Sequence, residues 1–427
     1  MSRNRRNLAL LFRARKKTGG APTASPLQRQ PAGDDKKIRI RSMRILLAIY
    51  FLQGMCFYGP VATLYRLSAG ISVFQIGVIE SISLGLSLAL ELPWGWVADR
   101  IGHRRTIVFC TLLFALSKVV FWRAETFGGF LAERVLLAVT VSGLSGCDAA
   151  YLSACAGETG AHRAFGAWEA VQTAGLLAAA AASSLFLGDN YRLAGLWTVA
   201  SYSAAALLSL GLGEPEGAAT HPADGPRPSL AAALGKSLGL APFLAGAALL
   251  SGTAQFVTVF LNQLIYRRAG IPTGWFGVLY GGVTVAALLG SRSHRVSARL
   301  GRRKAGAVLC LAAAGACALA LLPVPALAVL GVVALRVAAA LFSPLSLAVQ
   351  TDRADPAGRA TQLSCNAMVA DLVTLALTPA LGRAADTGVP LALLISAGAC
   401  LLGAALVWRG LGLALFPPKG RQTVNKV

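Results

Sequence analysis

Charged side chains are scarce in this sequence. Only 14% of its 427 residues are Asp, Glu, Lys or Arg, whereas 55% are hydrophobic. A soluble protein of this size needs more charge than that to cover its surface. The scarcity therefore excludes an ordinary soluble domain and indicates a membrane protein.

Motifs of enzymes and ATP-driven pumps are also missing. No Gly-x-x-x-x-Gly-Lys-Ser/Thr phosphate loop occurs, which argues against direct driving by ATP. The 4 histidines are scattered over predicted loops, and the 8 cysteines lie in apolar segments without a Cys-x-x-Cys pair. We therefore expect no enzyme activity, no metal, no cofactor and no disulfide.

Long apolar runs dominate the chain from residue 44 onward. A helix that crosses a bilayer needs about 20 apolar residues, and runs of about that length recur along the sequence. They predict an all-α polytopic membrane protein whose twelve transmembrane helices cover residues 44–65, 72–94, 105–122, 127–150, 164–187, 192–212, 241–265, 275–291, 305–322, 325–348, 361–382 and 389–411.

The distribution of the 40 Lys and Arg residues predicts the orientation. If the N-terminus is cytoplasmic, 30 of them fall on the cytoplasmic side, 6 on the opposite side and 4 within helices. Short loops rich in Lys and Arg stay in the cytoplasm, so both termini are predicted to be cytoplasmic. Topology thereby accounts for most of the net charge of +22, and nucleic acid is not an expected partner.

Parts of the first half recur in the second half at nearly constant spacing. The Ala-Gly-Ile triplet of residues 69–71 recurs 200 residues later, and residues 98–104 resemble residues 297–303 at an offset of 199. Arg134 and Arg336, each followed by Val, match at an offset of 202. These offsets predict a duplicated six-helix unit.

The repeat and the local composition predict five segments. A polar stretch with Pro and Gly at residues 214–228 places the boundary between the halves near residue 220. The expected segments are a disordered basic cytoplasmic tail at 1–43, a six-helix bundle at 44–212, a cytoplasmic linker at 213–240, a second six-helix bundle at 241–412 and a cytoplasmic tail at 413–427.

A charged stretch, Gly95 to Arg105, separates the second predicted helix from the third. Its glycines permit a tight turn, and one acid stands among four basic or potentially basic side chains. The stretch resembles the signature loop between helices 2 and 3 of the major facilitator superfamily of secondary transporters. The resemblance implies two six-helix bundles that rock about a central site, with helices 1, 4, 7 and 10 lining the cavity.

The same resemblance assigns a cytoplasmic gate to this stretch. It implies that Asp99 latches the bundles in the outward-facing state by facing the N-terminal end of helix 11, where the helix dipole favours an anion. Asp148 or Glu158 is expected to pair with an arginine of the gate. Ala298 replaces the acid in the second copy, so the latch is expected on one side only. The gate residues are Gly95, Asp99, Arg100, Gly102, Arg104 and Arg105.

Ionisable side chains inside predicted helices are candidate site residues, because an unpaired charge within a bilayer is costly. Glu80, Lys118 and Arg134 fall in the outer third of helices 2, 3 and 4. We predict a buried ion pair of Glu80 with Lys118 or Arg134. Such a pair either belongs to the transport pathway or only fixes the packing of helices.

Asp371 on helix 11 and Arg336 on helix 10 both lie near mid-depth in the second half. A carboxylate whose surroundings change between two conformations suits a proton carrier. We therefore predict Asp371 as a proton-coupling site and Arg336 as a substrate or coupling residue. The alternative is a structural salt bridge between the two.

Neutral hydrogen-bonding groups also occur inside the second half. Such amides either contact a solute or join helix to helix. They are Gln255, Asn262 and Gln263 on helix 7, and Asn366 on helix 11.

The sequence predicts proton-coupled secondary transport of a small organic solute across a bacterial cytoplasmic membrane. The expected partners are the solute, protons and the bilayer, and the expected state is a monomer. Export of a drug-like or metabolite solute is favoured because the helices are largely apolar, although helix 5 lacks the Gly-Pro pair of drug–proton antiporters. The alternatives are an uptake permease for a sugar, nucleoside or organic acid, and a membrane scaffold or sensor that transports nothing.

Overall fold

A computed structural model describes residues 33–157, 160–214, 230–354 and 359–413, which are helical over most of their length. The first half contains α2 (Gly33–Gly54), α3 (Ala62–Ser68), α4 (Val73–Ile101), α5 (His103–Arg123), α6 (Phe127–Leu144), α7 (Cys147–Ala156), α8 (Ala161–Ala182) and α9 (Tyr191–Ser209). The second half contains α10 (Leu230–Gly239), α11 (Ala241–Gln255), α12 (Asn262–Arg268), α13 (Phe276–Ala287), α14 (Ser293–Leu300), α15 (Arg302–Ala320), α16 (Pro325–Arg353), α17 (Arg359–Thr387) and α18 (Val389–Leu413).

Within the described part of the chain, 11 helical stretches are long and apolar enough to cross a membrane. Four of them combine two consecutive helices: α2 with α3, α6 with α7, α11 with α12, and α13 with α14. The helix α9 is not among the 11 because its polar and aromatic residues lower its hydropathy. Its 19 residues are nevertheless long enough, and it packs against α5 and α2. The predicted twelve-helix fold is thereby confirmed.

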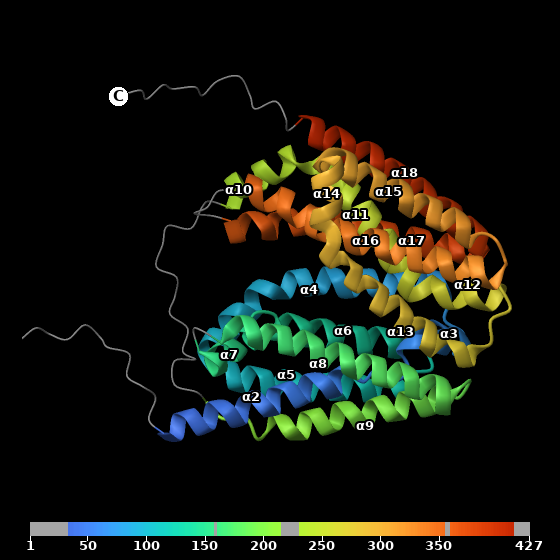
Figure 1. Cartoon of the computed structure of the whole chain (residues 1–427). Coiled ribbons are helices and arrows are strands. Elements are labelled where there is room, and N and C mark those ends of the chain that lie inside the picture. Colours follow the sequence, from blue (N-terminus) through green and yellow to red (C-terminus); the bar gives the residue numbers. More distant parts are fainter. Residues whose placement is uncertain (1–32, 158–159, 215–229, 355–358, 414–427) are drawn as a thin grey trace, which may run out of the picture.

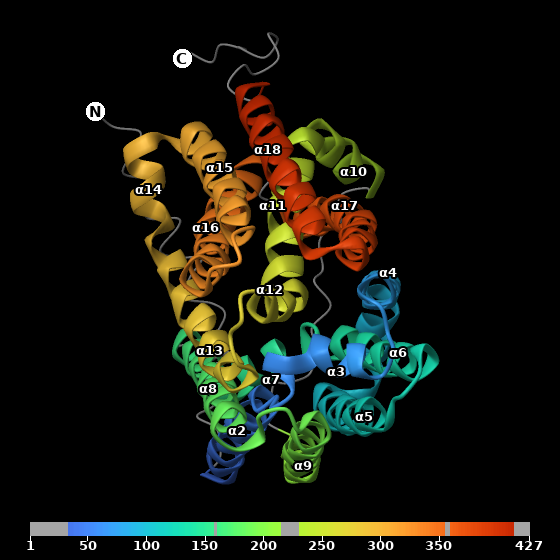
Figure 2. The same cartoon turned by 90° about the vertical axis from the view of Figure 1, so that its right-hand side faces the viewer.

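The helices form two bundles, one from each half of the chain (Figure 1). We call the end of the molecule that carries Gly102 and Gly301 the motif end, and the opposite end the closed end. Near the closed end the bundles meet along two seams, α4 against α17 and α8 against α13 (Figure 2). Toward the motif end, where α7 and α10 lie, the bundles part (Figure 1).

The charged stretch from Gly95 to Arg105 is helical almost throughout, so the predicted turn is wrong in extent. The helix α4 continues to Ile101 and α5 begins at His103, which leaves Gly102 (φ 88°) as the joint. Gly301 (φ 74°) makes the same joint between α14 and α15. Glycine adopts this positive φ without the steric cost that a side chain brings. The backbone thus repeats the offset of 199 residues found in the sequence.

Three further helix bounds differ from the predictions. The helix α2 begins at Gly33, inside the predicted tail, and α10 lies inside the predicted linker. The fourth span breaks between α6 and α7, where Gly146 has φ 82°. Hydropathy misses the start of α2 because Lys and Arg are good helix formers, so a helix can extend well beyond its apolar run.

Glycines allow close contact between the first and fifth spans. A methyl group added at Gly175 of α8 would lie 2.1 Å from the carbonyl oxygen of Phe51, and one added at Gly54 would lie 2.3 Å from the carbonyl oxygen of Gln172. Helices in a bilayer are held together largely by such van der Waals packing. The crossing of α2 and α8 therefore depends on these two glycines.

Replacing Gly175 by Ala is expected to destabilise the protein by roughly 1–3 kcal/mol, because the added methyl group has no room. The measurement is the midpoint of thermal unfolding in detergent. Gly166→Ala on the same helix is the matched control, since a methyl group there meets nothing within 4 Å. It should leave the midpoint unchanged or raise it slightly, because Ala favours helix. Equal midpoints for the two variants would contradict this packing account.

Candidate functional site

The first span is interrupted between α2 and α3. Residues 55–58 leave the helix and a 3-10 turn, Gly59–Val61, follows, because Pro60 lacks an N–H and its ring crowds the preceding turn. The freed N–H of Phe57 donates to Thr198 Oγ1 at 3.0 Å. The seventh span is irregular at the equivalent place, where a π-helical turn, Phe256–Leu261, joins α11 to α12. Paired interruptions in the two halves of a transporter commonly mark the solute site.

A cluster of charged side chains lies beside this interruption, in the N-terminal bundle. Glu80 of α4 is its first centre: its Oε1 is 2.6 Å from Arg134 Nη2 and 3.2 Å from Arg66 Nη1. The side chain of Arg66 is only 2% exposed, and its guanidinium lies 5.7 Å from the ring centre of Phe121 and 6.0 Å from that of Phe130. Glu80 thereby links Arg134 of α6, in the fourth span, to Arg66 of the short helix α3.

Glu133 of α6 is the second centre of the cluster. Its Oε1 is 3.3 Å from Lys118 Nζ, and its Oε2 is 3.6 Å from Arg134 Nε. Lys118 also donates to the hydroxyl of Tyr58 at 3.1 Å, which anchors the interrupted segment of the first span. Glu133 and Lys118 are 1% and 5% exposed, whereas Arg134 and Glu80 are 21% and 18% exposed. Three cations against two carboxylates leave the cluster with one excess positive charge.

The cluster corrects the sequence prediction in detail. Glu80 pairs with Arg134, but the structure pairs Lys118 with Glu133 instead of Glu80. Sequence reasoning singled out neither Glu133 nor Arg66, and Arg66 stands one residue beyond the predicted span of residues 44–65, close to the turn at Ala69 and Gly70. The sequence marks Arg66 only by its position, because it lies inside an apolar run that continues to Leu67.

In the C-terminal bundle, Arg336 and Asp371 do not meet. Among the described residues Arg336 takes part in no ion pair, and its half-buried guanidinium lies close enough to Tyr280 of α13 to interact electrostatically. Asp371 of α17 interacts instead with Glu91 of α4, across the seam between the bundles. The alternative of a structural salt bridge between them is therefore not formed, and the two residues have separate surroundings.

Three of the four predicted amides are used by the protein itself. Gln263 Oε1 accepts the N–H groups of Thr63 and Leu64, each at 3.0 Å. Asn262 Oδ1 accepts the N–H of Gln263. Asn366 is buried and accepts from Ser237 of α10 at 2.8 Å. Gln263 and Asn366 therefore join helices, Asn262 bonds to the next residue of its own helix, and Gln255 is exposed.

The arginines at the motif end fasten the bundles internally. Arg104 Nε donates to the carbonyl oxygen of Leu212 at 2.6 Å, just beyond α9. Arg303 does the same to Trp408 of α18 at 2.9 Å, so both copies of the motif hold the last span of their own bundle. Arg100 lies 3.6 Å from the ring centre of Trp96, and Arg105 is exposed.

Asp148, the one predicted acidic partner of the gate that the structure describes, does not lie with these arginines. Asp148 accepts the N–H of Ala149 at the start of α7, and no ion pair with an arginine forms among the described residues. A carboxylate at that place satisfies the free N–H groups of its own helix start. Glu158 and the side chain of Asp99 lie outside the described part, so the latch of Asp99 stays a prediction.

Two grooves lie along helices that border the space between the bundles. One, of about 310 Å³, runs along α11, α16 and α17 and is mainly apolar, with Ser251, Ser343, Ser346 and Gln350 as polar members. The other, of about 370 Å³, lies on α8 and includes Trp168, whose ring stacks on Tyr50 at 4.7 Å between centroids. The first groove has the apolar lining with few polar groups that organic ligands favour, whereas Glu169 and Gln172 make the second more polar.

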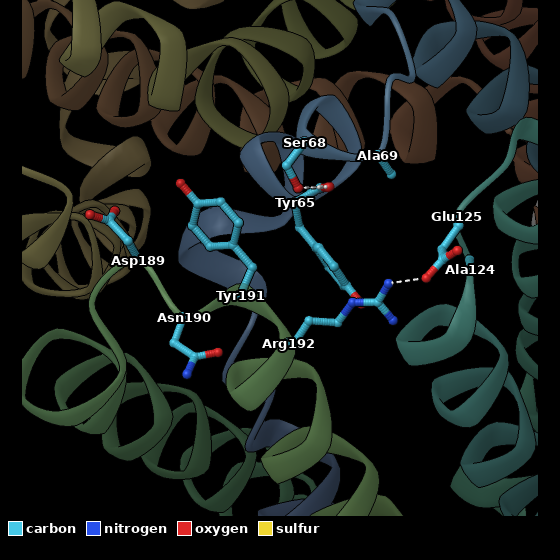
Figure 3. Close-up of a pocket in the computed structure, with 9 residues that line it drawn as sticks. All are labelled: Tyr65, Ser68, Ala69, Ala124, Glu125, Asp189, Asn190, Tyr191 and Arg192. Carbon is cyan, nitrogen blue, oxygen red and sulfur yellow. Dashed lines mark hydrogen bonds and ion pairs between the residues drawn. The ribbon is translucent and has the colours of Figure 1, made fainter.

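A further pocket, of about 760 Å³, lies at the closed end (Figure 3). The rings of Tyr65 and Tyr191 stand beside each other with centroids 6.5 Å apart, and the exposed ion pair of Arg192 and Glu125 borders them. All of its lining residues belong to the N-terminal bundle. The pocket is therefore separate from the space between the bundles.

Twelve membrane-length helices in two repeated bundles, joined at one end and parted at the other, define a polytopic transporter fold. The chain belongs to the Major Facilitator Superfamily, whose sequence model matches residues 43–335. It is a transporter of that class, as the resemblance of the charged stretch implied. No curated protein sequence matches the chain.

Solved structures with the same fold include transporters of several solutes. The nucleoside transporter NupG is 16% identical with a TM-score of 0.71, and the match covers 88% of this chain and 100% of that one. A bacterial homolog of the human lysosomal transporter Spinster, inward-facing and unoccupied, is 15% identical with a TM-score of 0.69, covering 91% and 100%. The peptide transporter POT is 14% identical with a TM-score of 0.66, covering 88% and 94%. At these identities the likeness shows the fold alone.

Replacing Glu133 by Gln is expected to lower the free energy of unfolding by about 3–5 kcal/mol, because a buried cation loses its partner. Thermal unfolding in detergent measures this loss. The control is Glu125→Gln, since that glutamate pairs with Arg192 at the surface and is 69% exposed, where an ion pair contributes little. If Glu133→Gln unfolded no earlier than Glu125→Gln, the buried cluster would not stabilise the bundle.

Proposed function

We propose that the chain is a proton-coupled secondary transporter of a small organic solute that carries a negative charge. The observation that carries the proposal is Arg336, a half-buried cation in a membrane span that takes part in no ion pair with the described residues. Its repeat equivalent, Arg134, contacts two glutamates. An unpaired charge in a membrane costs several kcal/mol, and an anionic solute would supply the missing partner.

The parting of the bundles supports alternating access. The motif end carries most of the described Lys and Arg side chains, so we assign it to the cytoplasm by the positive-inside rule. The structure then corresponds to the inward-facing state, in agreement with its likeness to the Spinster homolog, which is described as inward-facing. We further propose that the protein acts as a monomer in a bacterial cytoplasmic membrane.

Asp371 and Glu91 support coupling to protons. They belong to different bundles and interact across the seam of α4 and α17. Two negative charges repel each other more strongly as they approach, so closing the motif end is opposed while both carboxylates are ionised. A proton on Asp371 removes that repulsion, which links protonation to the change of state.

Export from the cytoplasm is the direction we favour, because the groove of α11, α16 and α17 opens among apolar residues such as Leu244, Phe342 and Leu347. An amphiphilic organic anion suits such a lining, and Ala339, which lines the groove, lies one turn from Arg336 on α16. Uptake of an organic acid would use the same residues. Flux measured in both directions across a liposome membrane separates the two.

Replacing Arg336 by Gln is expected to weaken binding of anionic solutes about tenfold or more, because a charge-assisted hydrogen bond is lost. A thermal-shift screen of the purified protein against organic anions and their neutral analogues measures this. Neutral solutes should be affected little. Arg383→Gln, which removes an exposed arginine near the closed end, is the matched control, and equal anion binding by Arg336→Gln and the wild type would refute the assignment.

Replacing Asp371 by Asn is expected to uncouple solute flux from the proton gradient, because the side chain no longer gains or loses a proton. Flux in proteoliposomes, with and without an imposed pH difference, measures the coupling, using a solute identified in the thermal-shift screen. Downhill flux should persist. The control is Asp189→Asn at the closed end, which should keep the pH dependence. A pH-driven flux in Asp371→Asn equal to that of the wild type would remove Asp371 from the mechanism.

A further inference from the structure

Near the closed end, side chains of one bundle bind the starts of helices in the other bundle. The first is Gln263 of α12, which is buried between the bundles. Its Oε1 accepts the N–H groups of both Thr63 and Leu64, each at 3.0 Å. These are the second and third residues of α3, which begins after the interruption of the first span.

The second is Asp386, near the end of α17. Its two carboxylate oxygens accept the N–H groups of Val73 at 2.7 Å and Phe74 at 3.0 Å, the first two residues of α4. The remaining N–H of that first turn is satisfied locally, because Ser72 Oγ accepts from Gln75. A carboxylate at a helix start also interacts favourably with the helix dipole.

The third contact runs in the opposite direction. Ser184, in the π-helical turn that follows α8, accepts the N–H of Val278 at 3.0 Å. Val278 is the third residue of α13. Three helix starts, two in the N-terminal bundle and one in the C-terminal bundle, are thus capped from across the interface.

Caps of this kind exist only while the bundles touch. The first four N–H groups of a helix have no partner within the helix, so a side chain or water must supply one. Separating the bundles would strip all three helix starts at once. The capped N–H groups therefore belong to the closed state specifically, whereas a hydrogen bond within one bundle would persist in both states.

Glycines at the same crossings bring the caps within reach. A methyl group at Gly77 would lie 2.9 Å from the carbonyl oxygen of Thr378, one at Gly382 would lie 2.7 Å from that of Val73, and one at Gly277 would lie 2.1 Å from that of Ala180. The backbones of opposite bundles are therefore in direct contact at both seams. Side chains as short as Ser and Asp can then reach the backbone of the other bundle.

We propose that Gln263, Asp386 and Ser184 are the positioning residues of the closed gate and that the three caps form and break together. The proposal rests on the alternating access inferred above. It assigns the gate to hydrogen bonds between side chains and backbone, and it names the amide hydrogens that report the opening: those of Thr63, Leu64, Val73, Phe74 and Val278.

Hydrogen–deuterium exchange of the purified full-length protein, read by mass spectrometry, tests this without any solute. Gln263→Leu is expected to speed exchange about fivefold at Thr63 and Leu64, the typical effect of losing one helix cap. A comparable increase is expected in the peptides that contain Val73 and Val278, which Gln263 does not touch. Gln263→Glu keeps an accepting oxygen and should restore slow exchange at all three places.

An increase confined to the peptide of Thr63 and Leu64 would overturn the proposal, because it would make Gln263 a local cap. If Gln263→Leu fails to fold, Asp386→Ala serves instead, since Asp386 is exposed, and its remote readout is the exchange of Thr63 and Val278. Asp189→Ala, which removes an exposed acid of the closed end that caps no helix of the other bundle, is the matched control and should change none of these peptides. Failure of the transport proposal would appear in the flux and binding assays instead. The exchange results do not depend on those assays, because they are measured without any solute.

Discussion

The arrangement of this protein depends on finding partners for backbone N–H groups inside a bilayer, where lipid offers none. Pro60 interrupts the first span, and the freed groups must be satisfied by other spans. Thr198 of α9 accepts one from Phe57, and Gln263 of the opposite bundle accepts those at the start of α3. The interruption thereby binds the first span to its own bundle through Thr198 and to the opposite bundle through Gln263. Tyr58, which lies in the interruption, carries the contact to Lys118 and so fixes the charged cluster beside it.

The two halves share the same backbone arrangement, as expected from duplication, but they differ in the charged side chains inside the membrane. Gly102 and Gly301 make equivalent joints, and Arg104 and Arg303 bind equivalent last spans. The arginines inside the membrane differ, because Arg134 has glutamate partners in α4 and α6, whereas α17 offers no such partner to Arg336. A paired charge is costly to disturb and suits a fixed framework. An unpaired one is available to a ligand, which is why the solute proposal rests on the second half although the better-known motif lies in the first.

Hydropathy and internal spacing were sufficient to predict the twelve spans and the two bundles, whereas the family was predicted from the resemblance of the charged stretch, Gly95 to Arg105, to a signature loop. The spans could be predicted because they depend on composition, which a bilayer constrains strongly. The site was predicted less well, because composition does not say which way a side chain points or what it meets. The pair of Glu80 and Arg134 could be predicted, because both are ionisable groups at similar depth. The role of Arg66 could not, because it stands just outside the predicted span of residues 44–65. Gln263 could equally contact a solute or a helix, and only the position of α3 decides between them. Helix ends were missed for a related reason: one glycine at position 102 is enough to turn the chain, so the charged residues before it stay helical.

The short helix α3 is where the charged cluster and the gate come together. It has seven residues and is separated from α2 by the interruption, so it can shift as a unit without bending a continuous helix. Its first turn is capped by Gln263 from the opposite bundle, and its Arg66 binds Glu80, which also binds Arg134. Arg134 is therefore connected through Glu80 and Arg66 to the helix start that Gln263 caps. Arg134 and Glu80 are the more exposed members of the cluster, and Arg66 is its buried one. The cluster thus has a more exposed side, at Glu80 and Arg134, and a buried side, at Arg66, that reaches the helix start bound by the opposite bundle.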